Sequence, residues 1–244
     1  MGTSPVHRLD PRAKILGFIG LTVVVVTTPA RAVWAFALYG AVLVFLIGLA
    51  RLPLGFVAKR AAVVLPFVLM VAVFLPFFPQ TGGGEYNLGG LHVSPEGLLM
   101  LWNVAAKSTL GAMSMIVLVS TTPFSRLIAG LEGLRVPRVF TLITSFMYRY
   151  SFLFLEEYQR MRRAMASRNY CGRWLWQSSV LGHVLSSLFL RSYERAERVY
   201  VAMVSRGYAG TMGPTVSLSF RATDGAFLVT MAVLLAGIRA FAHA

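Results

Sequence analysis

The chain has 244 residues, of which 57% are hydrophobic and only 13% are charged. Soluble domains average about 45–50% apolar and about 25% charged residues, so this composition excludes an ordinary soluble domain and predicts an integral membrane protein. The formal net charge is +14, and the single cysteine, Cys171, excludes an internal disulfide framework and a cysteine-rich metal site.

Five apolar segments are expected to cross the membrane as helices, because each approaches the roughly 20 residues that a bilayer requires. The first also resembles a signal peptide, with basic residues before an apolar run and "TPARA" after it. A second apolar segment follows almost at once, so we favour a helical hairpin that turns at Pro29. The five segments lie near residues 14–30, 32–50, 61–79, 98–120 and 225–242.

Lysine and arginine predict the orientation of these spans, because cytoplasmic connections are enriched in both. The N-terminal segment and the connection 51–60 carry three basic residues each, whereas the glycine-rich connection 80–97 has none. Arg31, on an outer turn, is the one exception among the connections. We therefore expect a multi-pass protein of the plasma or inner cell membrane, with a cytoplasmic N-terminus and an external C-terminus.

Most of the remaining positive charge lies in residues 121–223, which hold fourteen arginines and five glutamates. An apolar stripe at helical spacing from Phe124 to Leu134 predicts one helix, which ends by Pro137. We therefore predict an all-α polytopic membrane protein of about five transmembrane helices with long amphipathic helices on the cytoplasmic side. Its predicted regions are a four-span bundle (1–120), a cytoplasmic helical region (121–223) and a C-terminal transmembrane helix (224–244).

Two long helices are predicted within this cytoplasmic region. One runs for about thirty residues to Arg168, and the other follows Gly172; both change from apolar to strongly charged along their length. Their apolar parts, 140–155 and 174–190, contain Arg149 and His183, which would be costly inside a bilayer. We interpret both parts as amphipathic surfaces that pack on other helices or on the inner interface.

Each long helix closes with the same pattern, A-M-x-S-R-x-Y-x-G. The copies are "AMASRNYCG" at 164–172 and "AMVSRGYAG" at 202–210, offset by 38 residues. Gly207 suits the left-handed conformation that commonly follows a helix end, and Asn169 is the next best residue for it. Helix capping alone would explain one arginine near a helix C-terminus.

The duplication favours a second interpretation, in which two equal sockets on a two-fold symmetric partner receive the two helix ends. Arginine suits such a socket, because its planar guanidinium makes several directed hydrogen bonds. The candidate docking residues are Ala164, Met165, Ser167, Arg168 and Asn169 in the first copy, and Ala202, Met203, Ser205, Arg206 and Gly207 in the second.

Three polar residues beside or within the spans have simpler interpretations. Asp10 and Pro11 are predicted to start the first helix as its cap and first residue, and Asp224 to cap the last one. Lys107 lies within the fourth span, where a lysine either serves transport or pairs inside the bundle.

Catalysis finds no support in the sequence. The chain has no phosphate-binding G-x-x-x-x-G-K-[ST] loop, so it is not itself an ATPase. Its four histidines are too scattered for a metal site, and we predict no catalytic residue, metal site or cofactor.

The arginines belong to apolar helices beside membrane spans, which argues against a protein that binds nucleic acid. The alternatives are a self-contained channel or carrier and, from "ATDGAF", a membrane-embedded lipid phosphotransferase.

Four stretches carry a resemblance to a known family. They are "HRLDPRAKI" at 7–15, "TTPFSRLIAGLEGLRVPRVF" at 121–140, "SFMYRYSFLFLEEYQRMRRAMASR" at 145–168 and "ERVYVAMVSRGY" at 197–208. The chain resembles the T component, the transmembrane coupling protein, of energy-coupling-factor (ECF) ABC transporters, and in particular the CbiQ type of cobalt and nickel uptake systems. The resemblance runs nearly from end to end.

The resemblance implies a non-catalytic subunit whose two long helices are coupling helices. Its partners would be two copies of a cytoplasmic ABC ATPase of the CbiO type, a substrate-capture membrane subunit of the CbiM type, and a small accessory membrane subunit. The family's docking motif is typically Ala-Arg-Gly. It corresponds here to Ser167-Arg168-Asn169 and Ser205-Arg206-Gly207, so serine replaces alanine twice and asparagine replaces glycine once.

Overall fold

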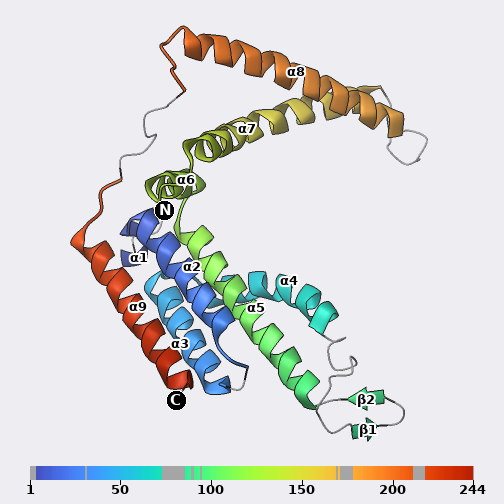
Figure 1. Cartoon of the computed structure of the whole chain (residues 1–244). Helices are drawn as coiled ribbons and strands as arrows, with labels where there is room; N and C mark the ends of the chain where they lie inside the picture. Colours follow the sequence, from blue (N-terminus) through green and yellow to red (C-terminus); the bar gives the residue numbers. More distant parts are fainter. Residues whose placement is uncertain are drawn as a thin grey trace. The chain divides into compact units, whose positions relative to one another are not determined.

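The structure is a computed structural model that describes residues 4–30, 32–72, 86–88, 91–93, 95–168, 170, 178–210 and 218–243. Helices make up nearly all of the described chain, as predicted, with one small hairpin in addition (Figure 1). The chain forms two compact units, Met1–Leu134 with Leu218–Ala244, and Arg135–Ser217.

The first unit is a helical bundle with a short antiparallel hairpin of β1 and β2. Its α2 and α3 form the predicted hairpin around Pro29, where the Ala32 amide donates to the Pro29 carbonyl at 3.3 Å. The elements are α1 (Pro5–Arg8), α2 (Pro11–Thr27), α3 (Val33–Leu49), α4 (Leu54–Ala72), β1 (Tyr86–Leu88), β2 (Leu91–Val93), α5 (Pro95–Thr121), α6 (Phe124–Gly133) and α9 (Ala222–His243).

Each of the five predicted spans falls on a helix of this unit, although the third, 61–79, is described only to residue 72. Among the described helices, two are long and apolar enough to cross a membrane, α5 over Leu99–Thr121 and α9 over Ala222–Ala242. The apolar α3, Val33–Leu49, is shorter. Helix positions are therefore confirmed, whereas a count of five membrane crossings stays a prediction.

The core of the first unit lies along α2, which contacts α5, α6 and α9. Phe18 and Leu21 of α2, Tyr39 and Leu43 of α3 and Val117 of α5 are fully buried within one apolar cluster. This burial makes α2 a central helix of the bundle rather than a peripheral one.

Asp10 and Pro11 begin α2 as predicted. The Asp10 carboxylate accepts a hydrogen bond from the Arg12 amide at 2.9 Å, and Pro11 occupies the first turn, where no backbone N–H is required. Asp224 does not precede α9 but is its third residue, and its two carboxylate oxygens accept from the Arg221 and Asp10 amides, each at 2.8 Å. One buried carboxylate thus joins the beginnings of α2 and α9.

Lys14 ties the same region to the end of α5. Its side chain is 1% exposed, and its ammonium donates to the Thr121 carbonyl and the Thr122 hydroxyl, both at 3.3 Å. The beginnings of α2 and α9 and the end of α5 therefore lie at one end of the bundle, as the predicted topology requires.

Replacing Asp224 with alanine is expected to destabilise this end of the bundle. Two backbone amides would lose their acceptor in a buried setting, and each unmade hydrogen bond costs about 1–3 kcal/mol. Thermal unfolding of the detergent-purified chain measures the loss. Asp224→Asn keeps one acceptor oxygen and should lose less, and the exposed Ser219→Ala should lose nothing. Equal stability of Asp224→Ala and the wild type would contradict this role.

The second unit contains α7 (Arg138–Ser167) and α8 (Ser178–Val204), which confirms both predicted long helices over their described residues. α6, predicted from its apolar stripe, packs in the first unit against α2 rather than in the second unit. A Cβ added at Gly130 of α6 would lie 3.0 Å from side-chain atoms of Pro11 and Ile15, so the two helices touch closely there. The division of 121–223 as one functional region stays a prediction.

Candidate coupling site

The two copies of the repeated pattern form helix ends with matching hydrogen bonds. The Ser167 hydroxyl donates to the Ala164 carbonyl at 2.9 Å, and the Arg168 amide donates to the Met165 carbonyl at 3.0 Å. The Tyr170 amide donates to the same Met165 carbonyl at 3.1 Å and so closes the end of α7. Every one of these bonds recurs 38 residues later.

At the end of α8 the Ser205 hydroxyl donates to the Ala202 carbonyl at 3.0 Å. The Arg206 and Tyr208 amides both donate to the Met203 carbonyl, at 3.1 and 3.0 Å. The Gly207 amide donates to the Val204 carbonyl at 2.9 Å, and Gly207 has φ of 83°. This is the Schellman arrangement, and it confirms the left-handed conformation predicted for Gly207.

Side-chain exposure also matches between the two ends. Ser167 and Arg168 are exposed, as are Ser205 and Arg206, whereas Met165 and Met203 are partly buried. Each serine hydroxyl is bonded to its own helix, and each arginine is exposed to solvent at the helix end. The two ends thus present the same guanidinium on the same scaffold.

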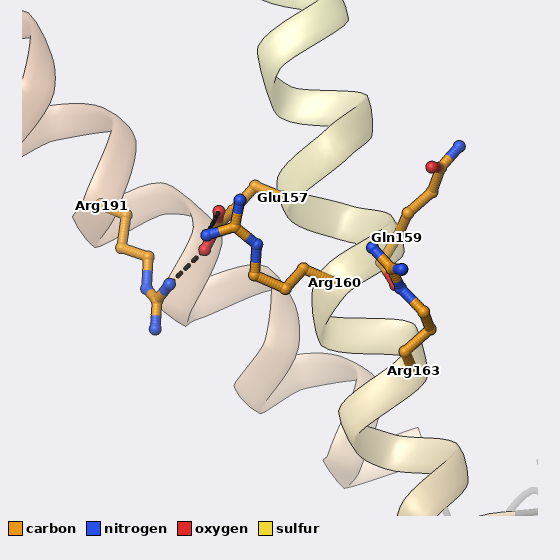
Figure 2. A network of polar contacts seen from close by, with 5 residues as sticks. All are labelled: Glu157, Gln159, Arg160, Arg163 and Arg191. Carbon is orange, nitrogen blue, oxygen red and sulfur yellow. Dashed lines mark hydrogen bonds and ion pairs between the residues drawn. The ribbon is translucent and has the colours of Figure 1, made fainter.

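The two helices cross at a charged contact in the second half of α7. The Glu157 carboxylate accepts a hydrogen bond from Arg191 of α8, and Arg160 lies 3.7 Å from its other oxygen (Figure 2). The Glu157 side chain is 18% exposed and that of Arg191 60%, so the contact is partly shielded from water. Figure 2 also shows Arg163 folded back onto its own helix, where its Nε donates to the Gln159 carbonyl at 3.4 Å.

An apolar groove of about 520 Å³ separates the first half of α7 from the second half of α8. Its walls include Phe146 and Tyr150 of α7 and Val199 and Met203 of α8, with Tyr208 at one end. Residues early in α7 therefore face residues late in α8, so the two helices run antiparallel. Within the second motif, Met203 and Tyr208 line the groove while Arg206 remains exposed.

The antiparallel arrangement separates the two arginines. Glu157 precedes Arg168 by 11 residues and Arg191 precedes Arg206 by 15 residues, which correspond to roughly 16 Å and roughly 22 Å of helix. The two helix ends lie on opposite sides of the crossing point and at most about 40 Å apart. One antiparallel pair of helices therefore carries two equivalent arginine ends, one on each side of the crossing.

Other predicted positions have simple outcomes. Asn169 lies outside the described residues, so its conformation is not compared with that of Gly207. Lys107 is partly buried within α5. Across the described ranges, no three histidine, cysteine, aspartate or glutamate side chains gather closely enough to hold a metal ion.

Two features of the structure were missed by sequence reasoning. The pairing of Glu157 with Arg191 spans 34 residues and two helices, and no local pattern indicates it. The burial of Lys14 has one signal in the sequence, because a lysine at the start of an apolar span either faces the interface or pairs inside the bundle. Both features depend on contacts between separate helices, which a local sequence motif does not show.

A protein-family model described as CbiQ, cobalt transport protein, matches residues 2–216 of the chain. The chain belongs to the CbiQ family. A fused cobalt transport protein, CbiMQ, of Methanocorpusculum labreanum is 28% identical over 86% of this chain and 36% of its own length, so the chain spans about a third of that relative.

Two further relatives are energy-coupling factor transporter transmembrane proteins, EcfT. That of Listeria innocua is 27% identical over 96% of this chain and 92% of its own length. That of Bacillus selenitireducens is 30% identical over 88% of this chain and 83% of its own length. The resemblance to T components of ECF transporters is thereby confirmed, and this CbiQ-family chain is similar to membrane components of transporters over nearly all of its length.

Proposed function

We propose that this chain is the coupling subunit of an ECF-type importer and docks two ATPase subunits through Arg168 and Arg206. The observation that supports this proposal most strongly is the matched geometry of the two helix ends. An ABC ATPase dimer has two equivalent subunits, and two equivalent helix ends on opposite sides of a crossing point suit such a partner. Arginine supplies charge-assisted, directed hydrogen bonds at each contact.

The proposed cargo is cobalt or nickel. The description of the family as cobalt transport proteins and the name of the Methanocorpusculum relative support a divalent metal. Metal capture is assigned to a separate membrane subunit of the CbiM type, with a small accessory membrane subunit. The chain itself makes no chemical change to the metal or to ATP.

Coupling would proceed through α7 and α8. ATP binding closes the ATPase dimer and draws the two docked ends into new positions relative to each other. The antiparallel helices then pivot near Glu157 and Arg191, and their motion reaches the capture subunit. The N-terminus lies on the ATPase side of the membrane and the C-terminus on the external side.

Metal uptake by reconstituted proteoliposomes tests this proposal against a self-contained carrier. We expect Co²⁺ uptake only when the chain, the ATPase and the capture subunit are all present with ATP. Omission of the ATPase, or its replacement by a variant that binds but does not hydrolyse ATP, should reduce uptake to background. Sustained Co²⁺ uptake by the chain alone would contradict the coupling role and support the carrier.

A further inference from the structure

The second large groove of the molecule lies in the first unit, between α3 and α9, with α1 at one end. Its volume is about 1090 Å³, and most of its lining is aliphatic or aromatic, including Val42, Phe45, Phe227 and Leu234. Phe45 at the rim is 69% exposed. Both α3 and α9 are apolar helices, and their placement in the proposed membrane bundle would expose this groove to lipid.

One end of the groove is strongly basic. Arg51, just after α3, and Arg221, just before α9, both line it, and Thr223 adds a hydroxyl group. None of the described residues that line the groove is acidic. This end lies where α9 begins, beside Asp10, and is therefore the end that the basic connections place at the cytoplasmic face.

Arg51 has a backbone conformation that is uncommon for a residue with a Cβ. Arg51 has φ of 55°, and the amides of Arg51 and Leu52 donate to the Gly48 and Ile47 carbonyls, at 2.9 and 3.2 Å. This is the position after a helix end where glycine is usual, and a residue with a Cβ is strained there. Strain of this kind is typical of positions retained for function.

Arg221 is held in place from the other side of the groove. Its amide donates to the buried Asp224 carboxylate, whose second oxygen accepts from the Asp10 amide. The backbone that carries this guanidinium is therefore fixed to the bundle, while the side chain itself is exposed. Two arginines whose backbones are held at one end of an apolar groove match a phosphate attached to an acyl chain.

We propose that the α3/α9 groove binds an anionic phospholipid of the leaflet at the Arg51 end of the bundle. The acyl chain lies between α3 and α9, and Arg51 and Arg221 bind the headgroup phosphate. The two charged residues at the polar end are arginines, and apart from Thr223 and Thr230 the rest of the described lining is apolar, which favours a lipid over a partner helix. The site depends on the membrane placement of the bundle and not on ATPase docking.

Native mass spectrometry of the full chain in detergent tests the proposal with dioleoyl-phosphatidylglycerol and dioleoyl-phosphatidylcholine as probes. We expect phosphatidylglycerol to bind on the order of tenfold more tightly, and thermal unfolding to shift upward with it because a ligand stabilises the state that it binds. Arg51→Gly and Arg221→Ala should each remove the preference. Arg51→Gly should fold at least as well as the wild type, because glycine relieves the strained backbone.

Two controls separate the site from general surface charge. Arg126→Ala removes another exposed arginine of the first unit and should keep the preference for phosphatidylglycerol. Ala41→Trp fills the groove, leaves both arginines in place, and should abolish lipid binding, whereas inorganic phosphate should not reproduce the thermal shift. Equal binding of the two lipids, or unchanged binding in Ala41→Trp, would overturn the proposal. Loss of the capture subunit from Arg51→Gly with normal lipid binding would also overturn it, in favour of a protein interface.

Discussion

Replacement of Arg168 and Arg206 together by alanine is expected to abolish ATP-driven metal uptake while the chain remains folded and in the membrane. Both side chains are exposed, so their loss leaves the packing of α7 and α8 unchanged. An arginine that is a hot spot of an interface costs about 2 kcal/mol or more when it is truncated, so each single variant should bind the ATPase roughly thirtyfold more weakly at the altered helix end. Proteoliposome uptake at a limiting ATPase concentration measures the result.

Uptake should fall in two steps, first in the single variants and then further in the double variant. Each single variant should retain partial uptake that recovers when the ATPase concentration is raised, and the double variant should not recover. Arg162→Ala with Arg198→Ala removes the same charge from exposed positions of α7 and α8 and serves as the matched control. Loss of uptake in this control as well would assign the effect to net charge and not to the helix ends.

A covalent crosslink between α7 and α8 is the second change with a large expected effect. Met147 and Val199 line the same groove, and Met147 lies 10 residues, roughly 15 Å, from the crossing at Glu157. In a Cys171→Ser background, Met147→Cys with Val199→Cys should lose uptake when a reducible bismaleimide joins the two thiols across the groove, and regain it when the reagent is cleaved by reduction. The physical reason is that a bond away from the pivot prevents the two helices from moving relative to each other.

Binding and motion are separable in this experiment. The crosslinked double-cysteine chain should still retain the ATPase, because both arginine ends are intact, and each single-cysteine chain should transport normally after the same treatment. Full uptake by the crosslinked chain, with the crosslink verified by mass spectrometry, would exclude relative motion of α7 and α8 as the coupling step.

The helices were predictable because their signals are local. Apolar runs placed α2, α3, α5 and α9, and the stripe that begins at Phe124 placed α6. The helix ends were predictable for the same reason, since the cap at Asp10 and the left-handed Gly207 depend only on neighbouring residues. The two arginine ends have matching hydrogen bonds because the same sequence pattern closes each long helix.

Contacts between distant elements could not be predicted in this way. The sequence does not show that Glu157 pairs with Arg191, that Lys14 reaches the end of α5, or that Asp224 serves two helices at once. The charge of residues 121–223 grouped α6 with the long helices, whereas close packing at Gly130 joins α6 to α2. The charge of a segment indicates that it is exposed to water. It does not indicate which other helices that segment packs against.

The affinity of the ATPase for the chain in nanodiscs tests the central claim most directly. Titration of the wild type, Arg168→Ala, Arg206→Ala and the double variant should show two equivalent ATPase sites, one remaining site in each single variant, and none in the double variant at the same concentrations. Equal binding in all four chains would show that the two arginines only cap their helices, and that the ATPase binds the chain through some other surface.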